Sequence, residues 1–183
     1  MRRKKHLFWL AALGLFALVG VAAATQPHPQ TAAVSAAFSA DQVRSHSRTC
    51  TQGGNTFRVT NAVWHGTSTS AEPRLAGNLV VTTRTVVNET TGDGWFSGTW
   101  RSISAAQMHP GHGRRPRSSA RLSGVISNGT HLDGLANGEV RADWARLLGN
   151  VSAVVNGTNV SGELGANAPV APNNSALLYR GGC

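Results

Sequence analysis

Apolar and polar residues alternate along most of this chain in short runs. A half-buried β-strand requires this pattern, because its successive side chains point to opposite faces. The alternating runs cover residues 57–65, 75–88, 95–103, 120–127, 131–143, 146–155, 160–164 and 176–180. We therefore expect about eight strands.

Residues suited to tight turns separate many of these runs. Thr91-Gly92-Asp93-Gly94, Asn128-Gly129 and Asn156-Gly157 are the clearest cases. Asn and Gly tolerate the positive φ that a two-residue hairpin turn demands. Strands joined by such turns should be antiparallel neighbours, so the sequence predicts an all-β fold.

One run indicates how the sheet curves. Along residues 131–143 one face carries only small or medium apolar side chains: Leu132, Gly134, Ala136, Gly138 and Val140. Small inward residues let a strand bend around a tight core. We expect a single small antiparallel barrel, closed or nearly closed, and keep a β-sandwich as the alternative. A parallel β-helix is less favoured, because the recurring Leu-x-Gly triplet has no steady period.

The first 24 residues have the features of a secretory signal. Arg2, Arg3, Lys4 and Lys5 precede an apolar run, and three alanines that suit signal peptidase end at Ala24. The alternative is an uncleaved anchor, since residues 7–24 approach the roughly 20 residues that span a bilayer. We expect cleavage, a flexible tether over residues 25–49 with room for a short helix, and a folded domain over 50–183.

Charge and composition agree with export. The chain has 17 Lys and Arg against 8 Asp and Glu, and loss of the four N-terminal cations leaves 13 against 8. All 13 are Arg, which together with abundant Ala, Gly and Val suggests a GC-rich coding sequence, and on composition alone we expect a bacterial source. We expect a secreted or cell-envelope protein with no membrane span after cleavage. An outer-membrane barrel is disfavoured, because aromatic residues are too few for two girdles and charged residues occupy outward positions.

The two cysteines bracket the predicted domain. Cys50 stands near its start and Cys183 is the last residue. In an oxidising compartment such a pair most often forms one disulfide, and the alternatives are free thiols or a bond to another chain. The sequence predicts a Cys50–Cys183 bond.

A basic segment is the most concentrated feature of the chain. No acidic residue occurs between Asp93 and Asp133, and Pro and Gly mark the middle of this stretch as a loop. The candidate binding residues are Arg101, His109, His112, Arg114, Arg115, Arg117 and Arg121. They suit an anionic partner, although a solvated hairpin loop would have the same composition.

No catalytic, metal or cofactor motif stands out. GxSxG, P-loop, HExxH and CxxC patterns are absent from the sequence. His131 and Asp133 lie two apart and share a face with Glu139, but the opposite face of that run is the apolar one. These three side chains should point to water, and we expect no cofactor.

These observations favour a non-catalytic β-domain that contacts an anionic polymer or a protein partner through its basic loop. The alternative is a small-barrel enzyme or ligand carrier with an internal cavity. Nucleic acid is disfavoured, because aromatic residues do not interleave with the arginines. An interior filled by apolar side chains would favour the first reading, and a cavity with convergent polar groups the second.

Overall fold

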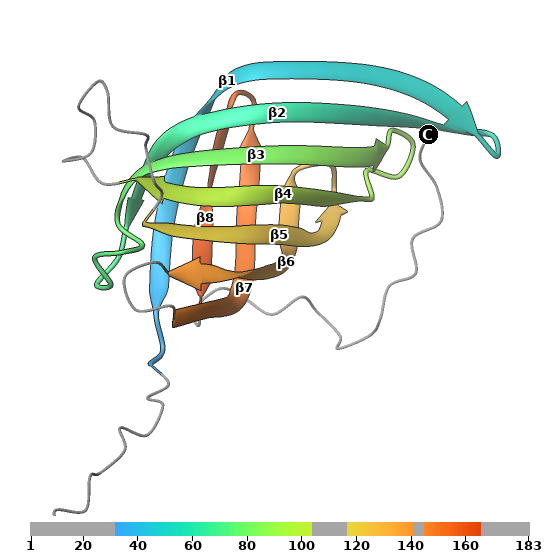
Figure 1. Cartoon of the computed structure of the whole chain (residues 1–183). Coiled ribbons are helices and arrows are strands. Elements are labelled where there is room, and N and C mark those ends of the chain that lie inside the picture. Colours follow the sequence, from blue (N-terminus) through green and yellow to red (C-terminus); the bar gives the residue numbers. More distant parts are fainter. Residues whose placement is uncertain (1–31, 104–116, 141–144, 166–183) are drawn as a thin grey trace, which may run out of the picture. The chain divides into compact units, whose positions relative to one another are not determined.

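A computed structural model of the chain describes residues 32–103, 117–140 and 145–165, and its regular elements are all strands. They are β1 Ser35–Gln52, β2 Asn55–Thr69, β3 Gly77–Asn88, β4 Gly94–Ile103, β5 Ser118–Ser127, β6 His131–Val140, β7 Ala145–Asn156 and β8 Asn159–Gly165 (Figure 1). Within these residues, no helix has the length and apolarity needed to cross a membrane. The predicted all-β class is confirmed.

The strands form a closed antiparallel barrel in chain order. Each strand pairs with the next one along the chain, and β1 closes the ring by pairing with β8 from Ser35↔Gly165 to Asp41↔Asn159. The expected hairpin turns adopt left-handed backbone, with φ of 51° at Asn128 and 60° at Gly157. The barrel is thus confirmed, and the sandwich and β-helix alternatives are wrong.

The predicted tether is wrong over most of its length. Residues 35–49, expected to be flexible or briefly helical, belong to β1, so the barrel begins at Ser35 and not near Cys50. Beyond a register shift between Gln42 and Arg44, β1 pairs with β2 alone among the described strands. Its side chains there are polar on both faces, which leaves no alternation to detect. The predicted signal segment, residues 25–31 and the run 176–180 lie outside the described residues.

The hydrophobic core fills the inside of the barrel. Trp100 on β4 is fully buried, and its ring packs edge-on against Phe38 of β1, with centroids 5.1 Å apart. Trp64 of β2 donates its indole N–H to the Thr83 hydroxyl of β3 at 2.9 Å. Leu79, Ala136 and Leu164 have exposures of 1% or less, which places β3, β6 and β8 in the same core.

Glycines let the wall of the barrel come close to its contents. Gly124 of β5 and Gly134 of β6 pair directly on the inner face. A Cβ on Gly124 would lie 2.2 Å from the Asp133 carbonyl oxygen and 2.7 Å from the Phe96 ring. Only glycine therefore fits beneath Phe96, and the expectation that small inward residues accompany a tight core is confirmed.

The loop between β2 and β3 covers one end of this core. Leu75 is 1% exposed, and its carbonyl accepts a hydrogen bond from the buried Ser68 hydroxyl. The Arg74 carbonyl accepts a 2.7 Å bond from the Ser102 hydroxyl, which also bonds to the Ser118 hydroxyl at 2.8 Å. β2 and β4 thereby hold the loop over the barrel through its backbone, and Ser118 of β5 supports Ser102.

Two charged side chains stiffen the same loop. The Arg74 guanidinium donates to both carboxylate oxygens of Glu72, at 2.6 Å from Nε and 2.8 Å from Nη2. These hydrogen bonds lower the pKa of the Glu72 carboxyl from 4.5 to about 2. Glu72 therefore stays ionised, and paired with Arg74, well below the pH at which an ordinary glutamate is protonated.

Candidate functional site

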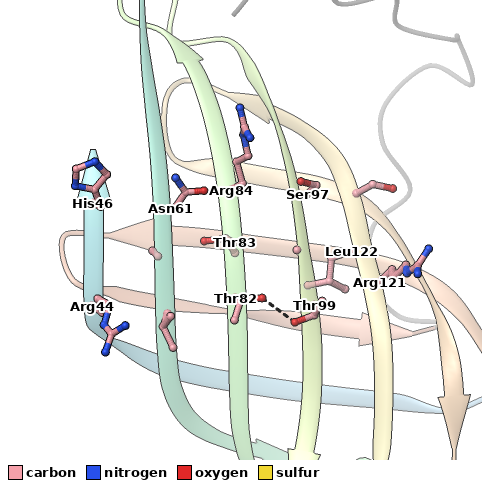
Figure 2. A pocket seen from close by; sticks show the side chains of 14 residues that line it. Arg44, His46, Asn61, Thr82, Thr83, Arg84, Ser97, Thr99, Arg121 and Leu122 are labelled. Atoms are coloured by element: carbon pink, nitrogen blue, oxygen red, sulfur yellow. Dashed lines mark hydrogen bonds between the residues drawn. The ribbon is translucent and has the colours of Figure 1, made fainter. Parts of the chain in front are cut away.

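The outer face of β1–β5 carries a hollow lined by cations and hydroxyl groups. Strand register places two rows of outward residues side by side: Arg44, Val63, Thr82, Thr99 and Arg121 in one, and His46, Asn61, Arg84, Ser97 and Ser123 in the other. Together with the backbone beneath them they line an open groove of about 720 Å³ (Figure 2). We call it the basic groove.

The ionisable residues that line the basic groove are all basic. Arg44, Arg84 and Arg121 are exposed, His46 lies beside them, and no acidic residue is among those that line the groove. Within the described part of the chain none of the three arginines forms an ion pair. Their guanidinium groups are therefore available to an external anion.

Neighbouring groups hold the floor and one wall of the groove in place. The Thr82 and Thr99 hydroxyls share a hydrogen bond of 2.7 Å across β3 and β4, which Figure 2 marks between them. The Arg84 guanidinium lies over the Trp95 ring, 6.0 Å from its centroid. Such a cation–π contact orients the arginine and leaves its N–H groups free to donate.

The groove crosses several strands. Arg44 on β1 and Arg121 on β5 are four strand spacings apart, which is roughly 19 Å at about 4.8 Å per spacing. Arg84 on the intervening β3 lies between them. The cations thus follow a line across the sheet and do not converge on one point, which suits an extended ligand more than a small one.

The structure separates the sequence-predicted residues into three groups. Arg101 and Arg121 are outward, exposed and diagonal neighbours on β4 and β5, because Arg101 pairs with Ser119 and Arg121 with Thr99. Arg117 lies at the end of the barrel, where its Nη1 donates to the Pro73 carbonyl at 3.2 Å. His109, His112, Arg114 and Arg115 lie outside the described residues.

A second hollow continues the groove toward β7. Arg101 and Arg121 line it together with Arg146, Glu139 and the exposed Leu148. Glu139 and Arg146 are direct cross-strand neighbours on β6 and β7. This hollow is therefore mixed in charge, and the purely cationic surface is confined to β1–β5.

Sequence reasoning missed Arg44, His46 and Arg84. The first two were assigned to the tether, and Arg84 lies outside the basic segment of the sequence. Their common feature is an outward position at matching levels of β1 and β3, which only the strand register reveals. Basic residues at the alternate positions 44 and 46 were the available signal, because a strand places both on one face.

The inside of the barrel offers little polar chemistry. Its described inward residues are mostly apolar, and a third pocket lies at the rim beside Ser35, Thr69 and Glu163. No three His, Cys, Asp or Glu side chains of the described residues gather where a metal could bind. His131, predicted to point to water, is exposed on the outer face.

The two tryptophans of β4 lie on opposite faces of the strand. Trp95, on the face of Ser97, Thr99 and Arg101, is partly exposed on the outside, whereas Trp100 is fully buried. Trp95 thus belongs to the surface that carries the basic groove.

No family model, curated protein or solved structure matches this chain. What it binds must therefore be inferred from its own side chains.

Proposed function

We propose that the exported part of this chain is a non-catalytic β-domain that binds an anionic polymer bearing phosphate or sulfate groups. The basic groove carries the proposal: Arg44, Arg84, Arg121 and His46 line one hollow that has no acidic residue. Planar guanidinium groups match the oxygens of phosphate and sulfate, and such groups act with least neutralisation where no carboxylate competes.

The shape of the groove favours a polymer over a small anion. Its arginines are spread over about 19 Å at ordinary strand spacing, so a ligand must present several charges to contact all of them. Hydroxyl and amide groups from Thr82, Thr99, Ser97 and Asn61 lie between the cations, where they can hydrogen-bond the neutral parts of a chain. The basic loop that joins β4 to β5 would extend the contact beyond Arg121.

The rival function, an enzyme or carrier with an internal cavity, has less support. The described inward positions are filled by side chains such as Phe38, Trp100 and Leu79, and the β2–β3 loop covers one end with Leu75. A ligand inside the barrel would have to displace this packing. The outer face needs no rearrangement to accept a partner.

Export and a disulfide belong to the same proposal. We expect cleavage after Ala24, so that the mature protein starts at Thr25, and a bond between Cys50 and Cys183. Both suit a domain that works outside the cytoplasm of a bacterium, free or in the cell envelope. N-terminal sequencing of exported protein tests the first of these expectations, since a start at Met1 in membranes would mean an anchor.

Retention on heparin and phosphocellulose columns tests the binding proposal. The variant Arg84→Ser with Arg121→Ser should elute at lower salt than the native protein, because it makes two fewer contacts with the anionic matrix. Salt releases the remaining contacts, since exposed charges are screened within about 10 Å at 0.1 M salt. Each lost arginine should weaken binding about two- to fivefold at low salt, as expected for an exposed ion pair. Adding the substitutions Arg114→Ser, Arg115→Ser and Arg117→Ser to this variant should weaken binding further.

A matched variant separates the groove from net charge. Arg58→Ser with Arg180→Ser also removes two cations, and Arg58 lies outside the groove, where its Nε is 3.7 Å from Glu89. This control should elute closer to the native protein than the groove variant does. Equal elution of the two variants would mean that only total charge matters. Capture of acidic proteins without polyanion binding would point to a protein partner.

A further inference from the structure

A second apolar cluster lies on the outside of the barrel. It consists of Phe57 and Val59 of β2 and Val86 of β3, with Cys50 and Trp95 packed against them. Strand pairing sets Cys50 beside Phe57, and Val86 between Val59 and Trp95. We call these five residues the outer patch.

The members of the outer patch face away from the core. Trp64 of β2 points into the barrel, and Phe57 and Val59 stand at odd positions of the same regularly paired strand, so they point outward. Arg58, between them on the opposite face, is exposed. In most of the barrel the inward side chains are buried and the outward ones are exposed. On this stretch of β2 the outward residues Phe57 and Val59 are buried, and the inward residue Arg58 is exposed to water.

The burial of the patch requires a covering layer. Phe57, Val59 and Val86 have exposures of only 4%, 2% and 1%. Neighbours within one sheet shield a side chain only at its flanks, and full burial of a sheet face needs a second layer about 10 Å above it. None of the eight described strands supplies that layer, because all of them belong to the wall of the barrel itself.

We propose that the outer patch is the docking site of the chain's own C-terminal segment, residues 166–183. This segment contains the apolar run Ala176-Leu177-Leu178-Tyr179 and ends at Cys183, the only other cysteine of the chain. Cys50 stands at the edge of the patch, so a Cys50–Cys183 bond would fix the segment above Phe57. Leu177, Leu178 and Tyr179 would then supply the missing apolar layer.

The length of the segment fits this path. β8 ends at Gly165, which pairs with Ser35, and Cys50 lies 15 residues farther along β1, or about 50 Å at the strand rise. Eighteen residues in extended conformation reach about 60 Å. The segment can therefore run from the end of β8 to the patch with a few residues to spare.

Forming the disulfide balances simply. The Cys50 and Cys183 thiols lose two protons and two electrons, and one S–S bond forms between them. A disulfide-bearing oxidant of the exporting compartment accepts the electrons and becomes a dithiol, through a mixed-disulfide intermediate. Without the bond, the C-terminal segment could exchange between a docked and an undocked state. The bond would hold it in the docked state.

Methyl NMR of the full mature chain tests the docking. With labelled Val and Leu methyl groups, we expect nuclear Overhauser contacts from Val59 and Val86 to Leu177 or Leu178. A second sample, half labelled and half unlabelled, should show no such contacts between molecules. Contacts only between molecules would assign the patch to a second copy, and absence of any contact would overturn the proposal.

Two further measurements test the docking without assigned NMR signals. Peptide mapping without reductant should yield a linked Cys50–Cys183 pair, and two alkylatable thiols or a reducible dimer would contradict the anchor. Leu177→Ser with Leu178→Ser should raise binding of a hydrophobic dye severalfold, whereas the control Asn173→Ser with Asn174→Ser should not. Equal dye binding by the two variants would mean that something else covers the patch.

Discussion

The two faces of β2 show how differently the inside and outside of this barrel are built. From Ala62 onward its buried apolar side chains, Ala62 and Trp64, point inward and join one continuous core. Nearer the β1–β2 turn its apolar side chains, Phe57 and Val59, point outward into the outer patch. One strand thus changes its buried face part-way along, without a register shift in its pairing with β3.

This difference separates two structural requirements. The inner face needs only to fill a closed volume, so any well-packed set of apolar residues would satisfy it. The outer face is divided into the cationic groove and the apolar patch, which adjoin where Arg84 meets Trp95. Closing a barrel does not require the outer face to be divided in this way, which is why we propose that binding partners contact the outer face.

The largest expected effect contrasts the core with an exposed outer position. Trp100→Ala should lower the free energy of unfolding by about 3–5 kcal/mol, because it empties a fully buried site. Leu148→Ala, at an outward site 74% exposed, should change it by less than about 0.5 kcal/mol. Urea unfolding followed by circular dichroism measures both, and similar losses would break the distinction between the faces.

A smaller change in the free energy of unfolding tests whether the outer patch is as well buried as a core. Val86→Ala should lower the free energy of unfolding by about 2 kcal/mol, since it removes two buried carbons and leaves a cavity. Val154→Ala, on the outward side of β7 and 41% exposed, is the matched control and should cost less than about 0.5 kcal/mol. If both valines cost the same small amount in chemical unfolding, the patch is solvated and its burial is not maintained in solution.

The smallest expected effect is the contribution of the Glu72–Arg74 pair to stability, which the arginines of the basic groove should not share. Hydrogen bonds from Arg74 hold the Glu72 pKa at about 2 in the folded protein, against 4.5 as its ordinary value. The resulting stabilisation is present above pH 4.5 and is lost as the pH falls from 4.5 toward 2. It should amount to about 1 kcal/mol after screening by solvent.

Thermal unfolding between pH 2 and pH 6 checks this effect. Glu72→Gln should flatten the acid limb of the stability curve, whereas Arg84→Gln in the basic groove should leave its shape unchanged. An unchanged acid limb in Glu72→Gln would show that the Glu72–Arg74 pair does not stabilise the loop.

Alternation predicted the fold well because burial on a single face leaves a period-two record. Seven of the eight expected runs correspond to strands β2–β8, and the small inward residues of β6 correctly favoured a closed barrel. The first strand was missed because two of its three buried residues before the register shift are only alanines, Ala36 and Ala40, and because residues 44–49 are polar on both faces. That segment is a strand because its backbone hydrogen-bonds to β2. Backbone pairing of this kind leaves no pattern in the segment's own side chains.

The candidate site was predicted only in part for a related reason. Arg101 and Arg121 were found because they cluster along the sequence, whereas Arg44 and Arg84 join the groove only through strand register. The outer patch was also recorded in the sequence, as a change from odd apolar positions at Phe57 and Val59 to even ones at Ala62 and Trp64. A change of phase within one run indicates that a strand is buried on different faces along its length.

The β1–β2 hairpin extends past the closed part of the barrel, where β1 is an edge strand among the described strands. Beyond Asp41, β1 has no partner other than β2 among the described strands, and Figure 1 shows the hairpin projecting past its neighbours. Unsatisfied backbone groups along such an edge can template pairing with another chain and lead to aggregation. Arg44, His46 and Arg48 follow that edge directly after an irregular step in its register. Because like charges repel, we expect Arg44 to disfavour edge-to-edge association of two copies, so a residue that lines the basic groove would also protect the edge of the sheet.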